Sequence, residues 1–282
     1  MNAHSFAYSD FIPVKSRKNR NRKGKSSPPL STLLAALQEQ LRQEEWFAQC
    51  SRILDSSWSG FSAQKPAVLC LGLGSPSSSL VARVQLAFLT ETCKRLDIAA
   101  DSVSLYDPIF TTEDTALFEE LQMNVLSKNR DTESYSLSVP TICFMPHCDI
   151  ELYDTLLRAN WNKEGLSNLF LLGNQLQEYL DNKPASVLET SVPFLLRAAP
   201  ALDSQPFPIA SAWPTAFNNM SAQCVSQSRP GIVDLLLAAP ASAAAAGASS
   251  KPEKDNSSEE TLEGESCRGI LESARASSPR PT

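Results

Sequence analysis

A glycine-rich segment that follows an apolar run is the first feature of the sequence that could do chemistry. Residues 68–74 read VLCLGLG, and Gly72 and Gly74 occupy the first two positions of a G-x-G-x-x-G motif. In such a turn the backbone approaches a phosphate closely, and the free N–H groups of the following helix point at the anion. Ser77 stands where the third glycine would be. Two interpretations stay open: a nucleotide-binding loop, or a tight strand-to-helix turn without a ligand.

Further polar side chains follow other apolar runs. Asp107 ends VSLYD, and Asn174 follows LFLLG. An acid at the end of a second strand can accept ribose hydroxyls, but it usually lies about 20 residues after the glycines. Asp107 comes 35 residues after Gly72 (107 minus 72), so the spacing is longer than usual. The simpler interpretation of Asn174, and of Asp149, is a helix cap.

His147 and Cys148 follow the run TICFMP. A histidine can act as a general acid or base or can ligate a metal or haem, and the alternative is a ring that caps a helix or bonds a backbone carbonyl. Cys148 is a candidate thiolate near a helix N-terminus, although an inert buried thiol is the expected state. No second histidine or cysteine pair stands at metal-ligand spacing, so no zinc site is predicted.

One repeated unit is expected to position these residues: a short apolar strand, a polar cap and an amphipathic helix. Apolar runs without alternation are typical of strands buried on both faces of a parallel sheet, and right-handed crossovers then place helices on both faces. We therefore predict an α/β, doubly wound, mainly parallel Rossmann-like sheet of about five strands. The carboxyl ends of its strands share one edge, where the predicted ligand crevice comprises Gly72, Gly74, Ser75, Asp107, His147, Cys148 and Asn174.

Smaller patterns predict the surrounding elements. Leu34, Leu37 and Leu41 have helical spacing and predict one helix over about 31–54, which DSSWSG at 55–60 should end. Thr111 and Asp114 have the spacing of a capping box. The segment SVPFLL at 191–196 is expected to be a sixth strand or an irregular cover.

The predicted organisation has four parts. Residues 1–30 form a disordered basic arm, 31–60 an N-terminal helix that packs on the domain, and 61–225 the α/β domain, with its core at 68–185. Residues 226–282 are an Ala/Ser-rich and then acidic tail, which is expected to be disordered. Seven cations among the eleven residues Lys15–Lys25 indicate either a solvated arm or a nuclear import signal that contacts an importin.

Composition bounds the function class. A net charge of −6 argues against nucleic-acid binding by the chain as a whole, and no run reaches the length of a membrane span. The seven cysteines form no C-x-x-C pair and no N-terminal segment resembles a signal peptide, which favours reduced thiols in the cytosol or nucleus. There is no G-x-x-x-x-G-K-[ST] loop and no G-x-S-x-G elbow, so no motif indicates catalysis strongly.

Taken in order, several of these segments resemble the sensitivity-to-red-light-reduced domain family. The specific parts are Tyr106-Asp107-Pro108, Met145-Pro146-His147-Cys148, Asn160-Trp161 and Gly173-Asn174. The resemblance covers roughly 68–185, with a weaker echo at AFNNMS, 216–221. The family's final box resembles Ala-Phe-Asn-Asp-Thr-Ser with a histidine soon after, whereas this chain has Asn219, Met220 and Gln223 at those places. That departure puts a charged role for the final box in doubt.

The resemblance implies a regulatory protein of the cytoplasm and nucleus, linked to circadian rhythm and clock gene expression, light signalling in plants and control of haem biosynthesis in animals. It implies unidentified protein partners and no established reaction. The leading hypothesis is a non-enzymatic regulator whose crevice binds a small ligand or has become a partner surface. The alternative is a nucleotide- or S-adenosylmethionine-dependent transferase that uses Asp107 and His147. Haem or a nucleotide is the cofactor to test, and direct haem binding would use His147 or Cys148.

Overall fold

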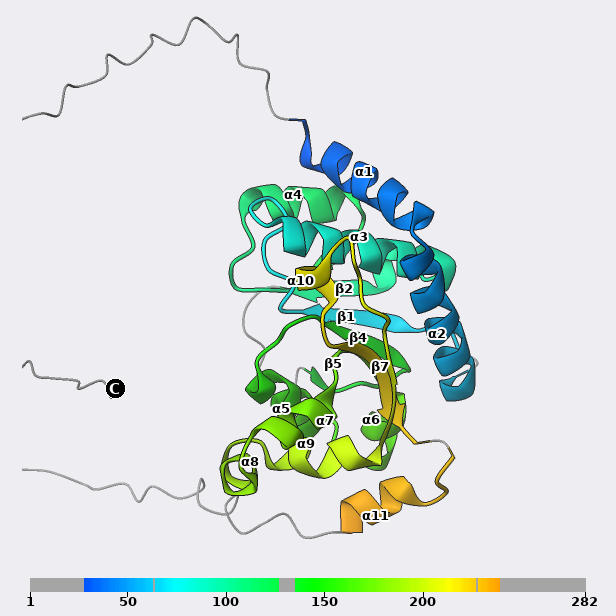
Figure 1. The fold of residues 1–282 in the computed structure, drawn as a ribbon, viewed down its shortest axis with the longest axis vertical. Coiled ribbons are helices and arrows are strands. Elements are labelled where there is room, and N and C mark those ends of the chain that lie inside the picture. The colour runs from blue at the N-terminus through cyan, green and yellow to red at the C-terminus, as the bar shows by residue number, and fades with distance from the viewer. Residues whose placement is uncertain (1–27, 63, 127–134, 227, 239–282) are drawn as a thin grey trace, which may run out of the picture. The chain divides into compact units, whose positions relative to one another are not determined.

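Seven strands form one sheet in the computed structural model, which describes residues 28–62, 64–126, 135–226 and 228–238 (Figure 1). All of these residues belong to one compact unit, Met1–Ser242. Of the expected disordered arm 1–30, residues 1–27, including Lys15–Lys25, lie outside the described residues, and of the expected disordered tail 226–282, residues 239–282 do, as does the second unit, Ala243–Thr282. The prediction is wrong for residues Ile232–Ala238, which form a helix.

The strand order is β3-β2-β1-β4-β5-β7-β6. The first five strands in the chain run parallel to one another, and β7 is antiparallel to both of its neighbours. The mainly parallel α/β sheet is confirmed, whereas the expected number of about five strands is wrong. The strands are β1 (Ala67–Leu71), β2 (Val103–Tyr106), β3 (Asn124–Val125), β4 (Thr141–Met145), β5 (Leu169–Asn174), β6 (Leu202–Pro206) and β7 (Met220–Val225).

Helices cover both faces of the sheet (Figure 1). One face packs against α1 (Leu30–Gln43), α2 (Glu45–Phe61), α3 (Leu80–Arg95), α4 (Thr112–Glu120) and α10 (Pro214–Phe217). The other packs against α5 (Ile150–Ala159), α6 (Lys163–Asn168), α7 (Leu176–Asn182), α8 (Ala185–Ser191), α9 (Pro193–Ala198) and α11 (Ile232–Ala238). The central strands β4 and β5 are buried at every residue, which explains why their sequences are continuous apolar runs.

The N-terminal region differs from the single helix that the leucine spacing predicts. The chain turns at Glu44, whose backbone is extended, so α1 and α2 are separate helices. The leucines of α1 face α3, while Trp58 of α2 packs on Phe170 of the sheet, and one straight helix could not reach both surfaces. The segment 55–60 does not end the helix, because α2 continues to Phe61.

The C-terminal third contains the strands that the sequence did not indicate. The segment 191–196 is neither a strand nor an irregular cover: Pro193 starts the helix α9, where a missing N–H costs nothing. The added strands are β6 and β7, which extend the sheet beyond β5. Within the described part of the chain, no helix combines the length and the apolar character needed to cross a bilayer.

Candidate functional site

The predicted site residues lie at one edge of the sheet. Leu71 pairs with Tyr106, and Met145 pairs with Gly173, so β1, β2, β4 and β5 end next to one another. We call the residues that follow or complete these four strand ends the rim. The rim comprises 72–79 after β1, Asp107 after β2, His147 and Cys148 after β4, and Asn174 at the end of β5.

Asp107 holds the glycine loop. Its Oδ2 accepts a hydrogen bond from the Gly74 N–H at 2.8 Å, and its Oδ1 accepts one from the Ile109 N–H at 3.0 Å. Gly74 has φ of +77°, a conformation that glycine adopts without strain. The acid that could have bound a ribose therefore already binds two backbone amides of its own chain.

A second carboxylate, Asp114, closes the same loop. It is fully buried and accepts hydrogen bonds from the Ser77 N–H at 2.7 Å and from the Thr111 N–H and hydroxyl, each at 2.9 Å. The predicted capping box of α4 is thus confirmed, and its acid also reaches the loop after β1. Burial raises the pKa of Asp114, but hydrogen bonds from Ser75, Thr111 and Ser77 outweigh it and hold the pKa below its ordinary value.

Ser75 and Ser77 complete this network. The Ser75 side chain is buried, and its hydroxyl lies 3.0 Å from that of Ser77. The Arg83 guanidinium donates to the carbonyls of Pro76 and Ser77. Side chains of the same chain therefore bind the Gly74 and Ser77 amides and the Pro76 and Ser77 carbonyls of this loop.

Cys148 fills the space beside Gly72. A Cβ on Gly72 would lie 2.5 Å from the Cys148 Sγ, and the thiol donates to the Leu71 carbonyl at 3.3 Å. Burial raises the pKa of Cys148 to about 12, with a further contribution from Asp107 and Asp149. The burial and this pKa favour the inert buried thiol that the sequence predicts over a reactive thiolate.

His147 is an exposed residue of the rim. Its φ of +55° lies in the left-handed region, and its N–H donates to the Asn174 Oδ1 at 3.0 Å. The ring Nε2 lies 3.1 Å from the Ala216 carbonyl, the distance of a hydrogen bond from the Nε2–H tautomer. Of the two interpretations of this histidine, the geometry favours the ring that bonds a backbone carbonyl.

Asn174 is not a helix cap. It ends β5, and α7 begins two residues later at Leu176. Its side chain instead accepts from the His147 N–H and donates to the Tyr179 hydroxyl at 2.7 Å. Asp149 does occupy the N-cap position of α5, but its side chain makes no capping hydrogen bond.

Two tyrosines that the sequence did not single out join the strand ends. The Tyr153 hydroxyl donates to the Met145 carbonyl at 2.5 Å and accepts from the Asn174 N–H at 3.0 Å. Gly173 leaves room for it, since a Cβ there would lie 2.8 Å from the Tyr153 hydroxyl oxygen. Tyr179 donates to the Cys148 carbonyl at 3.2 Å. A tyrosine three residues into an amphipathic helix gives no sequence signal for this role.

The start of β7 lies at the same edge, because Met220 pairs with Asn174. Gln223 is buried; its Oε1 accepts from the Leu176 N–H and its Nε2 donates to the Asn174 carbonyl. Gln223 thus ties β7 to the start of α7. Asn219 Oδ1 and Ser221 Oγ are buried without a hydrogen-bond partner. The AFNNMS segment therefore contributes to the rim although it is remote in sequence.

The arrangement brings the predicted residues together but leaves few of them free to react. Nothing in the described ranges gathers three or more His, Cys, Asp or Glu side chains around a position for a metal ion. The seven predicted residues all contact other groups of the chain, and among them only His147 is exposed, with its ring Nε2 bonded to the Ala216 carbonyl.

The chain is similar to several known proteins. The SRR1 domain family matches residues 33–224. A mouse (Mus musculus) SRR1-like protein is 28% identical over 182 residues, which cover 61% of this chain and 73% of the mouse protein.

The Arabidopsis thaliana protein SENSITIVITY TO RED LIGHT REDUCED 1 is 34% identical over 149 residues, which cover 53% of this chain and 52% of that protein. A Drosophila melanogaster SRR1-like protein is 27% identical over 135 residues, or 48% of each chain. The alignments thus span about half the length of the plant and fly relatives. No solved structure matches.

Proposed function

This chain belongs to the SRR1 domain family, and on that premise we propose that it is a non-enzymatic regulatory protein whose rim binds a protein partner. One observation carries the proposal. The Gly74 and Ser77 amides, which would bind an external anion in a nucleotide-binding loop, bind the carboxylates of Asp107 and Asp114 instead. A ligand phosphate would have to displace two negative charges that are already hydrogen-bonded.

The family name supports the biological setting. A relative is named for sensitivity to red light, and we propose a role in light or clock signalling, including circadian rhythm and clock gene expression. Control of haem biosynthesis and residence in both cytoplasm and nucleus belong to the same proposal. We further describe the sheet as Rossmann-like, because the order β3-β2-β1-β4-β5 is that of the first five strands of dinucleotide-binding folds.

A ligand screen tests the first half of the proposal. The purified full chain is titrated in a calorimeter with ATP, NAD, S-adenosylmethionine and haem, and its melting temperature is measured with each. We expect no saturable heat and no rise in melting temperature, because a ligand that binds only the folded state must raise it. A saturable rise with any of the four would contradict the closed rim.

A partner experiment tests the second half. The full chain is immobilised and exposed to extract from its native cells, in parallel with His147→Ala and Arg52→Ala. His147 is exposed on the rim, whereas Arg52 forms an exposed ion pair with Glu45 on α2. We expect proteins that bind the wild type and Arg52→Ala but not His147→Ala. Equal binding by all three chains would remove the rim as the partner surface.

The nuclear part of the proposal has its own test. Deleting Lys15–Lys25 removes the basic segment, and the distribution of the tagged chain between nucleus and cytoplasm is then measured. Loss of the nuclear fraction would support an importin contact. An unchanged distribution would contradict it.

The second candidate function is a nucleotide- or S-adenosylmethionine-dependent transferase. It is supported by the place of Gly72, Gly74 and Asp107 at the junction of β1, β2 and β4, where doubly wound sheets bind ligands. If one of these ligands binds, Asp107→Ala should weaken it by about 1–3 kcal/mol, because a buried partner would be left unpaired. For haem, a Soret band that persists in the Cys148→Ala/His147→Ala chain would exclude both residues as ligands.

A further inference from the structure

The short helix α10 lies between the N-terminal helices and the rim. The carbonyl of Ala216 accepts one hydrogen bond from His147 Nε2 at 3.1 Å and another from Gln85 Nε2 of α3 at 2.9 Å. The next residue, Phe217, packs against Trp46 of α2 with ring centroids 4.6 Å apart and the ring planes tilted by 33°. Two adjacent residues of α10 therefore contact the exposed histidine and the N-terminal helix pair.

Trp46 fixes the segment that leads into α10. Its indole N–H donates to the Pro208 carbonyl at 2.7 Å, and its ring also packs against Phe88 and Phe207. The Trp46 side chain is buried, so this hydrogen bond is not exchanged freely for one to water. The position of residues 207–217 thus depends on where α2 places one indole ring.

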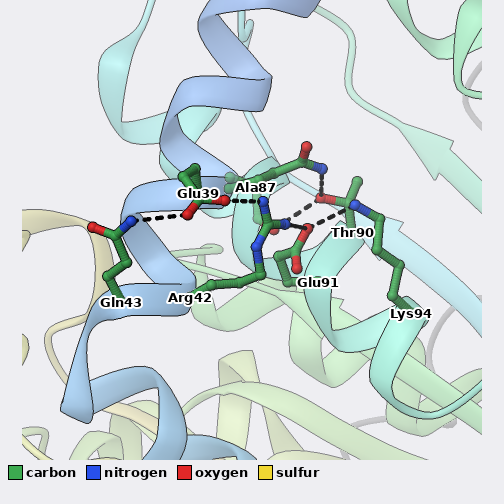
Figure 2. Close-up of polar contacts among 8 residues, drawn as sticks. Glu39, Arg42, Gln43, Ala87, Thr90, Glu91 and Lys94 are labelled. Atoms are coloured by element: carbon green, nitrogen blue, oxygen red, sulfur yellow. Dashed lines mark hydrogen bonds and ion pairs between the residues drawn. The ribbon is translucent and has the colours of Figure 1, made fainter.

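A charged cluster holds α1, the neighbouring helix, against α3 (Figure 2). Glu91 of α3 is only 5% exposed and accepts from Arg42 of α1 at 2.9 Å and from Lys94 at 2.7 Å. Figure 2 shows Arg42 reaching across to Glu91 while it also pairs with Glu39 of its own helix. A buried carboxylate that loses a partner is costly, so this cluster gives α1 a defined position on α3.

We propose that α1 and α2 are a positioning device for the rim: through Trp46 and α10 they set the orientation of the His147 ring. The inference rests on the proposed function, in which the rim binds a partner, and it names how that binding would be regulated. Anything that displaces α1 and α2 from α3 would move α10, break the His147–Ala216 hydrogen bond and alter the surface offered to the partner.

The tautomer of His147 provides a direct readout. While Nε2 donates to the Ala216 carbonyl, the neutral ring carries its proton on Nε2, and the imidazole nitrogen shifts of histidine-labelled full chain report this state. The chain has only two histidines, His4 and His147, so a His147→Gln chain assigns the signals. The measurement needs no partner, so its outcome is independent of whether the rim binds one.

Two tryptophans of α2 offer a matched pair of variants. Trp46→Phe keeps an aromatic ring but removes the N–H that binds Pro208, whereas Trp58→Phe changes a similarly buried ring that packs on Phe61 and Phe170. We expect Trp46→Phe to shift the His147 signals and to populate the Nδ1–H tautomer. Trp58→Phe should leave both unchanged.

A second variant tests the same linkage in case the tryptophan variant does not fold. Arg42→Met removes the α1 contact to Glu91 from a partly exposed position and should shift the same signals by less. Circular dichroism melts check that each variant is folded. If folded Trp46→Phe and Arg42→Met chains keep the wild-type His147 signals, or if Trp58→Phe shifts them equally, the proposed linkage is overturned.

Discussion

The two halves of the rim are closed by different chemistry. At the ends of β1 and β2, the carboxylates of Asp107 and Asp114 accept hydrogen bonds from the backbone amides of Gly74 and Ser77. At the ends of β4 and β5, hydroxyl, amide and carbonyl groups bond one another, with Tyr153 at the centre of the network. One half is thus closed by negative charge and the other by neutral groups.

Because of this difference, the two halves should respond differently to pH and to external anions. Hydrogen bonds to a carboxylate weaken when it is protonated, so the β1–β2 half should respond to acid and should resist external anions. The bonds that close the β4–β5 half are made by phenols, amides and carbonyls, which stay neutral between pH 3 and 9. The exposed His147 lies in the same half. A binding role therefore fits the second half better than the first.

Substitutions at the two glycines of the β1–β2 half should give the largest losses of stability, and the two losses should differ. Gly72→Ala places a Cβ against the Cys148 Sγ and forces an L residue to φ of +66°, so we expect a loss of about 3 kcal/mol in the free energy of unfolding. Gly74→Ala meets its nearest contact, the Ala82 Cβ, at 3.4 Å and should lose only about 1 kcal/mol, from φ alone. Urea unfolding measures both.

A double variant identifies the cause of that loss. Adding Cys148→Ala to Gly72→Ala removes the sulfur atom that the new methyl group meets, so the pair should be coupled favourably in a double-mutant cycle. If the two free-energy losses simply add, the close approach of Gly72 and Cys148 does not limit this position.

Asp114→Asn should cost about 2 kcal/mol, because an amide NH2 would face donors that the carboxylate now binds. The pKa of Asp114 is lowered in the folded chain, so its contribution is complete above the unfolded value of about 3.9 and is lost as pH falls through the folded value. The wild type should therefore lose more stability than Asp114→Asn between pH 5 and pH 2.5. Parallel slopes for the two chains would show that Asp114 does not supply this pH dependence.

Tyr153→Phe is the equivalent change in the β4–β5 half and should cost about 1.5 kcal/mol. It removes a donor to the Met145 carbonyl and an acceptor for the Asn174 N–H. Burial raises the pKa of Tyr153 well above its ordinary value, so the phenol is neutral throughout, and the loss should be the same at pH 4 and pH 8. A stability loss that grows as the pH falls would contradict the claim that neutral groups close the β4–β5 half.

His147→Gly should have the smallest effect on stability, within about 1 kcal/mol of the wild type. Glycine relieves the strain of φ at +55°, but it removes the hydrogen bond to Ala216 and adds freedom to the unfolded chain. Thermal unfolding tests this balance. A large loss would mean that His147 is a structural brace rather than an available surface group.

The sequence predicted the parallel part of the fold well, for a physical reason. The strands β1, β4 and β5 are almost wholly buried and therefore read as apolar runs, and parallel strands bring their carboxyl ends to one edge. The meeting of Gly74 with Asp107, although 33 residues apart, follows from that rule. The rule holds whatever the ligand is.

The parts that the sequence did not predict depend on tertiary contacts. β6 reads LDSQP, with no apolar run, and β7 buries Ser221 and Gln223, so neither resembles a core strand. Tyr153 and Asp114 bond to the rim only because Gly173 and the loop after β1 lie against them. Asn174 was assigned to a helix cap because a local pattern could not reveal its bond to His147.

The central claim is that the loop amides bind carboxylates of the same chain, and the amide resonances of Gly74 and Ser77 test it most directly. Nitrogen-15 spectra of the full chain are recorded during titration with ATP and, separately, with S-adenosylmethionine. We predict that both amides keep their shifts and their protection from hydrogen exchange to the end of each titration. A saturable shift of the Gly74 or Ser77 amide would contradict the account.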